Sequence, residues 1–255
     1  MRKADFLRFS ATGMLSVLIN PFLFVQALLL NFGQFRVRLQ NSKAFDGPGA
    51  AVASQRYRLP LRGEWLVATG GVTRQTSHSW NMPNQRYAYD FVKVAESPEG
   101  QSLRERRSLP DFPAFGQPIF APADGIVVRA RDGHRDYPFP GFGAVDMWCR
   151  DIRGNHVLIQ HRRDEFSLLA HLRKGSVTVE VGDQVGVGQK IGECGNSGHS
   201  TEPHLHFQVQ DRPSFHTATG KIVRWTKLCR NGAMIDDCAD LTRDDRVADA
   251  SGQIK

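Results

Sequence analysis

Between about residue 60 and residue 225 the chain is a series of short runs of β-forming residues, with turn-forming residues between them. The runs are Glu64–Thr69, Arg86–Val94, Ile119–Ala121, Gly125–Ala130, His156–Gln160, Phe166–His171 and His204–Gln210. Gly, Asn, Asp and Pro cluster between the runs, as in Pro122–Gly125 and Gly195–Gly198. Many short strands at close spacing, with few helical patterns, are typical of an all-β domain. We therefore predict an all-β fold.

The N-terminal segment has a different character. Three basic residues open it, Arg2, Lys3 and Arg8, and an uncharged stretch follows from Phe9 to Phe35, whose centre, Leu15–Leu30, is strongly apolar. This order favours an uncleaved signal anchor over residues 1–40, with the N-terminus in the cytoplasm. Three residues interrupt the apolar stretch: Asn20, Pro21 and Gln26. They leave open an amphipathic or buried helix instead.

Composition divides the rest of the chain. Residues 41–60 begin with small, polar, Gly- and Pro-bearing sequence, which predicts a linker. The β domain is expected over residues 61–225. Residues 226–255 are polar and acidic, which favours a weakly ordered tail. Pro98–Pro113 and Asp132–Ala144 resemble inserted loops that wall a cleft.

Charge and cysteine content narrow the function classes. The chain has 33 Lys and Arg against 26 Asp and Glu, a net charge of +7, which favours polyanionic surroundings such as cell wall or phospholipid. The basic residues are scattered, so no nucleic-acid binding is expected. The 4 cysteines form no C-x-x-C pair, which argues against a thiolate zinc site. Cys229 and Cys238 either form a small disulfide loop or remain thiols.

Several polar side chains fall on predicted strands where they need partners. His204 and His206 are two residues apart on a predicted strand, so both project from the same face. One imidazole can then bind a metal while the other contacts the metal-bound water. Asp90 falls on a small, apolar strand face, where a carboxylate is costly unless it pairs with Arg86 or binds a metal. His171 ends a hydrophobic strand and is either a core histidine with a partner or part of the same site.

Five motifs, in order along residues 63–225, together resemble the lysostaphin/LytM-type zinc endopeptidases. They are Gly116–Val128 (GQPIFAPADGIVV), Gly154–His161, Ser167–Leu172, Val179–Gly192 and Gly195–Phe207 (GNSGHSTEPHLHF). The resemblance implies the family's antiparallel β-sheet, a duplicated hybrid motif resembling a split barrel. It also implies a catalytic Zn²⁺ held by a histidine, an aspartate and the second histidine of the H-L-H motif.

Carried onto this sequence, the resemblance makes Asp90 and His206 zinc ligands. His171 and His204 match the family's two non-ligand histidines, which bracket the metal-bound water. One of the two would take the proton and the other would steady the tetrahedral intermediate. The division of these roles stays open.

The third ligand departs from the family pattern. The family has H-x-x-x-D, but Arg86 stands four residues before Asp90. The nearest upstream histidine is His78, twelve residues before the aspartate, with a loop between them that could return it to the metal. We predict His78 as the third ligand. Otherwise the site consists of Asp90 and His206 alone.

The resemblance implies a zinc metalloendopeptidase that hydrolyses peptide bonds in peptidoglycan stem peptides or cross-links. With the apolar N-terminus it predicts a cell-envelope location, either inner-membrane anchored facing the periplasm or exported. Two alternatives remain: a catalytically silent LytM-like module that binds and activates cell-wall amidases, and a peptidase acting on another exported peptide.

Overall fold

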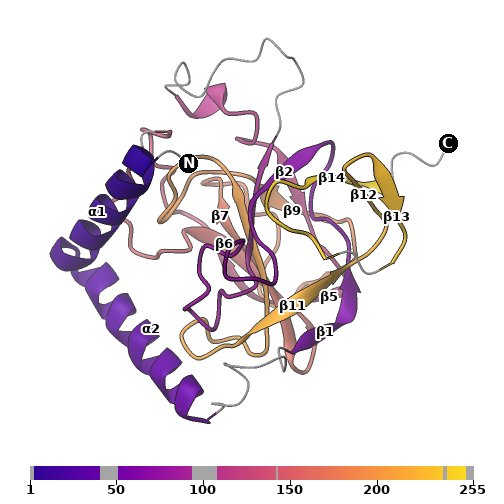
Figure 1. Cartoon of the computed structure of the whole chain (residues 1–255), viewed down its shortest axis with the longest axis horizontal. Helices are drawn as coiled ribbons and strands as arrows, with labels where there is room; N and C mark the ends of the chain where they lie inside the picture. The colour runs from indigo at the N-terminus through magenta and orange to yellow at the C-terminus, as the bar shows by residue number, and fades with distance from the viewer. Residues whose placement is uncertain (1–2, 41–50, 94–107, 142, 238–239, 251–255) are drawn as a thin grey trace.

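The computed structural model describes residues 3–40, 51–93, 108–141, 143–237 and 240–250 (Figure 1). Two helices come first, α1 (Lys3–Ile19) and α2 (Pro21–Gln40). The strands are β1 (Val52–Tyr57), β2 (Trp65–Thr69), β3 (Tyr89–Lys93), β4 (Pro118–Phe120), β5 (Gly125–Arg131), β6 (Asn155–Arg162), β7 (Glu165–Leu172), β8 (Gln184–Val185), β9 (Lys190–Glu193), β10 (Leu205–Gln210), β11 (Gly220–Trp225), β12 (Leu228–Arg230), β13 (Ala233–Ile235) and β14 (Arg246–Asp249). A 3₁₀ turn, η1, spans Leu109–Asp111.

Within the described residues, 12 strands form one sheet in the order β13-β12-β14-β2-β3-β10-β7-β6-β5-β8, with β11 paired to both β10 and β1. Neighbours run antiparallel except β1 and β11, which are parallel. Strands β4 and β9 make a small second sheet. The predicted all-β fold is confirmed.

An aromatic cluster fills one side of this sheet. Trp65, Phe91, Phe207 and Trp225 are fully buried, and the rings of Phe207 and Trp225 lie 5.1 Å apart. Side chains alternate along a strand, so the residue before Phe207 projects from the opposite face of β10. That residue is His206, and its face carries the polar groups described below.

Two expected boundaries are wrong. Strand β1 lies inside the predicted linker at 41–60 and pairs in parallel with β11; residues 41–50 lie outside the described part. The predicted weakly ordered tail at 226–255 contains β12, β13 and β14, and β14 joins the main sheet through β2. Leu228 and Val247 are buried there. A strand of three or four residues needs only one inward apolar side chain to pack against the core. Its charged neighbours then dominate the composition and hide the alternating pattern of a strand.

The structure describes most of one predicted loop and only the end of the other. Asp132–Ala144 has no strand of its own among its described residues and is held by an isolated bridge between Asp136 and Ser197. Of Pro98–Pro113, only the end from Ser108 is described, and it contains the 3₁₀ turn. Cys238 also lies outside the described residues, so its pairing with Cys229 stays a prediction.

Helices α1 and α2 lie along one side of the β domain, on the left in Figure 1. No single described helix is long and apolar enough to cross a membrane; Ala11–Ile19 and Pro21–Leu39 reach that length and composition only as a pair, bent by 103°. At the bend, the Asn20 amide donates to the carbonyls of Met147 (3.0 Å) and Cys149 (2.7 Å). Asn20 thus links the bend between α1 and α2 to the β domain by hydrogen bonds.

Candidate metal centre

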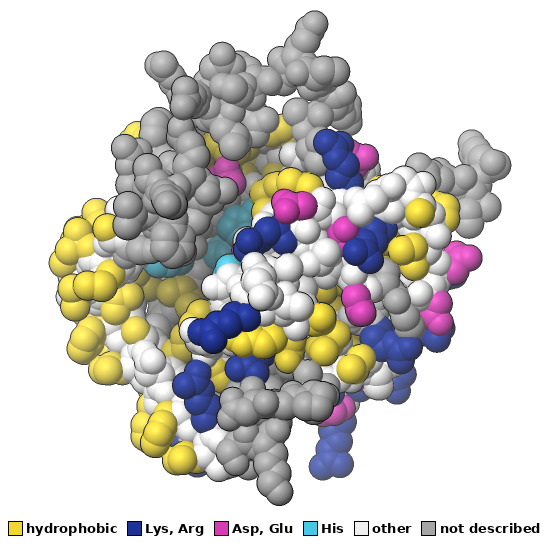
Figure 2. Space-filling model, in the orientation of Figure 1, with side chains coloured by type: hydrophobic (Ala, Val, Ile, Leu, Met, Phe, Trp, Pro, Cys, Tyr) yellow, Lys and Arg dark blue, Asp and Glu magenta, His cyan; other side chains and the backbone are white. Residues whose placement is uncertain are grey.

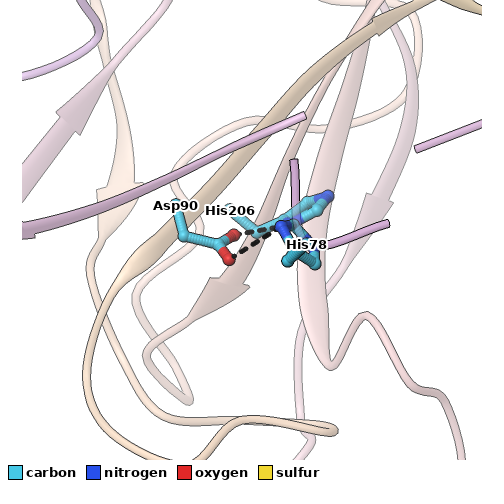
Figure 3. A group of neighbouring side chains, drawn as sticks. All are labelled: His78, Asp90 and His206. Carbon is cyan, nitrogen blue, oxygen red and sulfur yellow. Dashed lines mark hydrogen bonds and ion pairs between the residues drawn. The ribbon is translucent and has the colours of Figure 1, made fainter. Parts of the chain in front are cut away.

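Three side chains that are remote in sequence meet on one side of the sheet. His78, Asp90 and His206 each present a donor atom, and these atoms all lie within 4.8 Å of one another (Figure 3). Nδ1 of His206 lies 2.9 Å from Oδ1 of Asp90, and Nδ1 of His78 lies 3.4 Å from Oδ2. The structure therefore brings together the three residues that the sequence singled out as ligands.

Strand pairing places two of them. Asp90 on β3 and His206 on β10 are direct partners in the antiparallel register, so their side chains project side by side from the same face. Arg86 precedes β3 rather than sharing its face, which corrects the expected strand from Arg86 to Val94. Its guanidinium lies over the Trp80 ring, 4.9 Å from the centroid, and its Nε donates to the Trp80 carbonyl.

His78 arrives from the loop that joins β2 to β3. The loop leaves β2 at Gly70, whose φ of 151° and close approach to the Tyr89 ring exclude a side chain, since a Cβ would lie 2.3 Å from that ring. The Thr69 hydroxyl then contacts both His78 Nδ1 (2.8 Å) and Asp90 Oδ2 (3.0 Å). Thr69 thus holds the loop histidine against the strand carboxylate. No motif in the sequence points to Thr69.

A second residue missed at the sequence level orients His206. Gln208, two residues further on the same strand face, places Oε1 at 3.0 Å from His206 Nε2. Its Nε2 donates to the carbonyl of Asn84 (3.0 Å) and to Oε1 of Gln210 (2.7 Å). Because this amide orientation makes Oε1 the acceptor, the Nε2 proton of His206 points to Gln208 and Nδ1 faces Asp90. The sequence signal for Gln208 is its position two residues after His206, which puts both side chains on the same strand face.

His171 and His204 border the three-residue cluster. His204 Nε2 lies 3.7 Å from Asp90 Oδ1, and the His171 ring lies 4.8 Å from the His204 ring and 5.9 Å from that of His206. Each ring has Nδ1 at 2.8 Å from a backbone carbonyl, of Ser197 for His171 and of Glu202 for His204. With Nδ1 donating, both rings keep an Nε2 lone pair.

The sequence around this cluster is similar to that of a known protein family. Residues 110–221 match the sequence profile described as Peptidase family M23. The chain carries an M23 peptidase domain. The matched range contains His171, His204 and His206 but begins after His78 and Asp90; the tertiary structure places those two beside His206.

The similar proteins include a peptidoglycan endopeptidase. Peptidoglycan DD-endopeptidase ShyA of Vibrio cholerae is 35% identical over 176 residues, which are 68% of this chain and 32% of ShyA. Lysostaphin of Staphylococcus simulans is 35% identical over 143 residues, 56% of this chain and 24% of lysostaphin. The chain thus spans about a third or less of the length of these curated relatives. A crystal structure of a zinc containing peptidase from Vibrio cholerae superposes with a TM-score of 0.37 at 21% identity, covering 66% of this chain and 40% of that one.

Burial and the charges of neighbouring side chains shift the pKa values of the residues in this cluster. Burial raises the pKa of Asp90, but His78 and the hydrogen bond from His206 outweigh it and hold that pKa well below its usual range. Burial lowers the pKa of His206, but the same Asp90 contact raises it to a net increase. Burial, followed by the charges of His204 and His206, holds the pKa of His171 well below its ordinary value, so His171 is neutral at physiological pH.

The donor set fits a catalytic zinc ion. Two imidazoles and one carboxylate are three N and O donors of the kind found in open zinc sites, where a fourth position takes water or substrate. The His78 side chain is 31% exposed, whereas that of His206 is 8% exposed, so the cluster is accessible from the His78 side. Figure 2 shows histidine side chains at the bottom of a hollow on this face.

Proposed function

We propose that this chain is a zinc-dependent metalloendopeptidase that hydrolyses peptide bonds in peptidoglycan stem peptides or cross-links. The carrying observation is the convergence of His78, Asp90 and His206, within 4.8 Å of one another, inside a chain with an M23 domain. A relative named as a peptidoglycan DD-endopeptidase supports peptidoglycan as the substrate.

In this proposal His78, Asp90 and His206 hold the zinc. A bound zinc ion would supply Lewis acidity, which lowers the pKa of water and polarises a peptide carbonyl. Thr69 and Gln208 keep the donor atoms turned toward the metal. Gln208 accepts the Nε2 proton of His206 and thereby leaves Nδ1 for coordination.

His171 and His204 are the proposed general acid–base and oxyanion-stabilising residues. Each donates its Nδ1 proton to a backbone carbonyl, which fixes the ring orientation and leaves Nε2 as the basic atom. A neutral imidazole of this kind accepts a proton from the attacking water, and the protonated ring can return it to the leaving amine. Once protonated at Nε2, such a ring presents an N–H to the substrate and can stabilise negative charge on the carbonyl oxygen. We assign these two tasks to the pair.

The intact set of five side chains favours an enzyme over the silent, amidase-activating module. Such a module needs neither three converging donors nor two oriented histidines beside them. The proposed location is the cell envelope, with the peptidase domain on the periplasmic side and the N-terminal segment associated with the inner membrane.

The test is zinc content together with peptidoglycan digestion. Purified full-length protein should contain about one zinc per chain and release muropeptides from purified peptidoglycan, and His206→Ala should lose both. His134→Ala, a histidine outside the cluster, is the matched control and should keep both. Folded wild-type protein that binds no zinc and releases no muropeptides would refute the enzyme proposal; stimulation of a purified amidase would then support the alternative.

A further inference from the structure

The outward side of the α1–α2 pair is apolar along most of its length. Among the described exposed positions between residues 11 and 35, Asn31 alone is polar. The large exposed apolar side chains are Met14, Leu15, Leu18, Ile19, Phe22, Phe24, Val25, Leu28, Leu29, Phe32 and Phe35. They form the hydrophobic edge on the left of Figure 2. A continuous apolar surface of this extent is unusual on a protein surrounded by water and marks an interaction site.

The inward side of the same helices carries the polar residues. Ser16 and Gln34 are buried against the β domain. Ser16 Oγ lies 3.0 Å from Nε2 of His199, and the Gln34 amide donates to the His216 carbonyl at 2.8 Å. Gly33 lets α2 approach closely, since a Cβ there would lie 2.3 Å from the same carbonyl. A helix between a protein and water normally has the opposite pattern, with its apolar face inward.

The chemistry of the outward surface favours lipid over a protein partner. Protein interfaces form about one hydrogen bond per 100–200 Å², which a surface with a single polar residue cannot supply. The groups at its borders suit a membrane surface. Arg36 and Arg38 are exposed at the end of α2, and Trp148 and Arg150 are exposed beside the helix bend. Arginines attract anionic headgroups, and tryptophan favours the boundary between headgroups and acyl chains.

The contacts of the inward side argue against a spanning arrangement. From Ser16 to Gln34 the helices are hydrogen-bonded to loops of the β domain, including the carbonyls of Met147, Cys149 and His216. A pair crossing the bilayer would either draw these polar loops into hydrocarbon or break the contacts. Lying flat in the interface keeps every contact and still buries the outward apolar side chains.

We infer that α1 and α2 form a monotopic membrane-docking surface, lying flat on an anionic phospholipid bilayer with the peptidase domain packed on their other side. The inference rests on the membrane association in the proposed function but not on peptide hydrolysis. The helices also contact segments that shape the metal centre. Ser16 meets His199, two residues from the carbonyl partner of His171, and Gln34 Oε1 accepts a hydrogen bond from the backbone N–H of Asn84 at 3.2 Å. Docking would therefore hold the hydrolytic site beside the membrane.

Vesicle flotation tests the docking surface. The full-length protein should float with phosphatidylglycerol-containing vesicles and less with purely zwitterionic ones. Phe24→Glu/Phe32→Glu should lower the partition coefficient by at least about tenfold for each replaced side chain. Met234→Glu, at a residue of β13 that is 52% exposed, is the matched control and should bind as wild type does. An unchanged zinc content would show that the double variant is folded.

Depth measurements separate lying flat from spanning. Leu18, Val25 and Phe32 are replaced singly by tryptophan, and quenching by bilayers brominated near the headgroup or near the acyl-chain end is compared with wild type. A flat pair predicts preferential shallow quenching at all three positions. Deep quenching at Val25 with shallow quenching at the outer two would overturn the inference in favour of a bent spanning pair. Wild-type protein that never floats, including protein that self-associates through this surface, would overturn membrane docking itself. Zinc content and muropeptide release, measured separately, report on the proposed function.

Discussion

Replacing Gln208 by leucine should weaken zinc binding without touching a proposed ligand. Gln208 is buried, and its Oε1 is the acceptor for the Nε2 proton of His206, which is buried as well. Leucine fills a similar volume but accepts no proton. The buried imidazole N–H then has no acceptor, which costs about 1–3 kcal/mol. The imidazole is also free to rotate or to change tautomer, which turns a donor atom away from Asp90.

The loss of a residue that orients a metal ligand usually reduces affinity by about 10–100-fold, or about 1.4–2.8 kcal/mol. We expect that reduction for Gln208→Leu, measured by competition with a chromophoric zinc chelator. Urea denaturation of the metal-free protein should show a loss of about 1–3 kcal/mol in the free energy of unfolding. A part of that loss comes from the Asn84 carbonyl, which no longer receives the Gln208 amide proton.

Gln208→Glu separates the two contributions. The carboxylate keeps an acceptor for the His206 proton but removes the donor to Asn84 and Gln210. It should bind zinc at or above wild-type affinity while losing stability. If Gln208→Leu bound zinc as tightly as wild type while losing the same stability as Gln208→Glu, the orienting role of Gln208 would be wrong.

Other expectations concern the loop, the metal and pH. Thr69→Val removes the hydroxyl that contacts His78 and should lower zinc affinity about tenfold, while Thr69→Ser retains it; equal affinities in a chelator competition would contradict this role. Chelation should lower the melting temperature of wild type, because free zinc at about 100 times its Kd adds about 2.7 kcal/mol; His206→Ala should show no such response. Burial lowers the pKa of His156 from its ordinary value of 6.5 to about 3. Its neutral form therefore contributes stability that is complete above pH 6.5 and declines as pH falls toward 3, by up to about 1.4 kcal/mol per pH unit. His156→Leu should flatten this decline in urea denaturation between pH 6.5 and 4, and an unchanged slope would refute the assignment. Gln34→Ala leaves the buried backbone N–H of Asn84 without its acceptor and should cost about 1–3 kcal/mol in the free energy of unfolding, measured by urea denaturation.

Local covalent geometry explains what could be predicted from the sequence. Side chains alternate along any strand, so the short β-type runs indicated an all-β fold before any contact was known. The H-L-H motif likewise indicated two histidines able to reach one site, and both His204 and His206 do contact Asp90. The collinear motifs carried the family resemblance. Each of these inferences needs only neighbours along the chain.

The remaining features depend on distances between residues that are far apart in the sequence. The return of His78 to Asp90 is set by the turn at Gly70 and by the Thr69 hydroxyl, neither of which spacing alone could reveal. The C-terminal strands were mistaken for a tail because a strand of three or four residues becomes stable only through its partners in the sheet. The apolar N-terminal stretch showed its composition, but only packing against the β domain decided that Ser16, Asn20 and Gln34 face inward while a row of its apolar side chains faces outward. Hydrophobicity is a property of each residue, whereas the side it faces is decided by what packs against it.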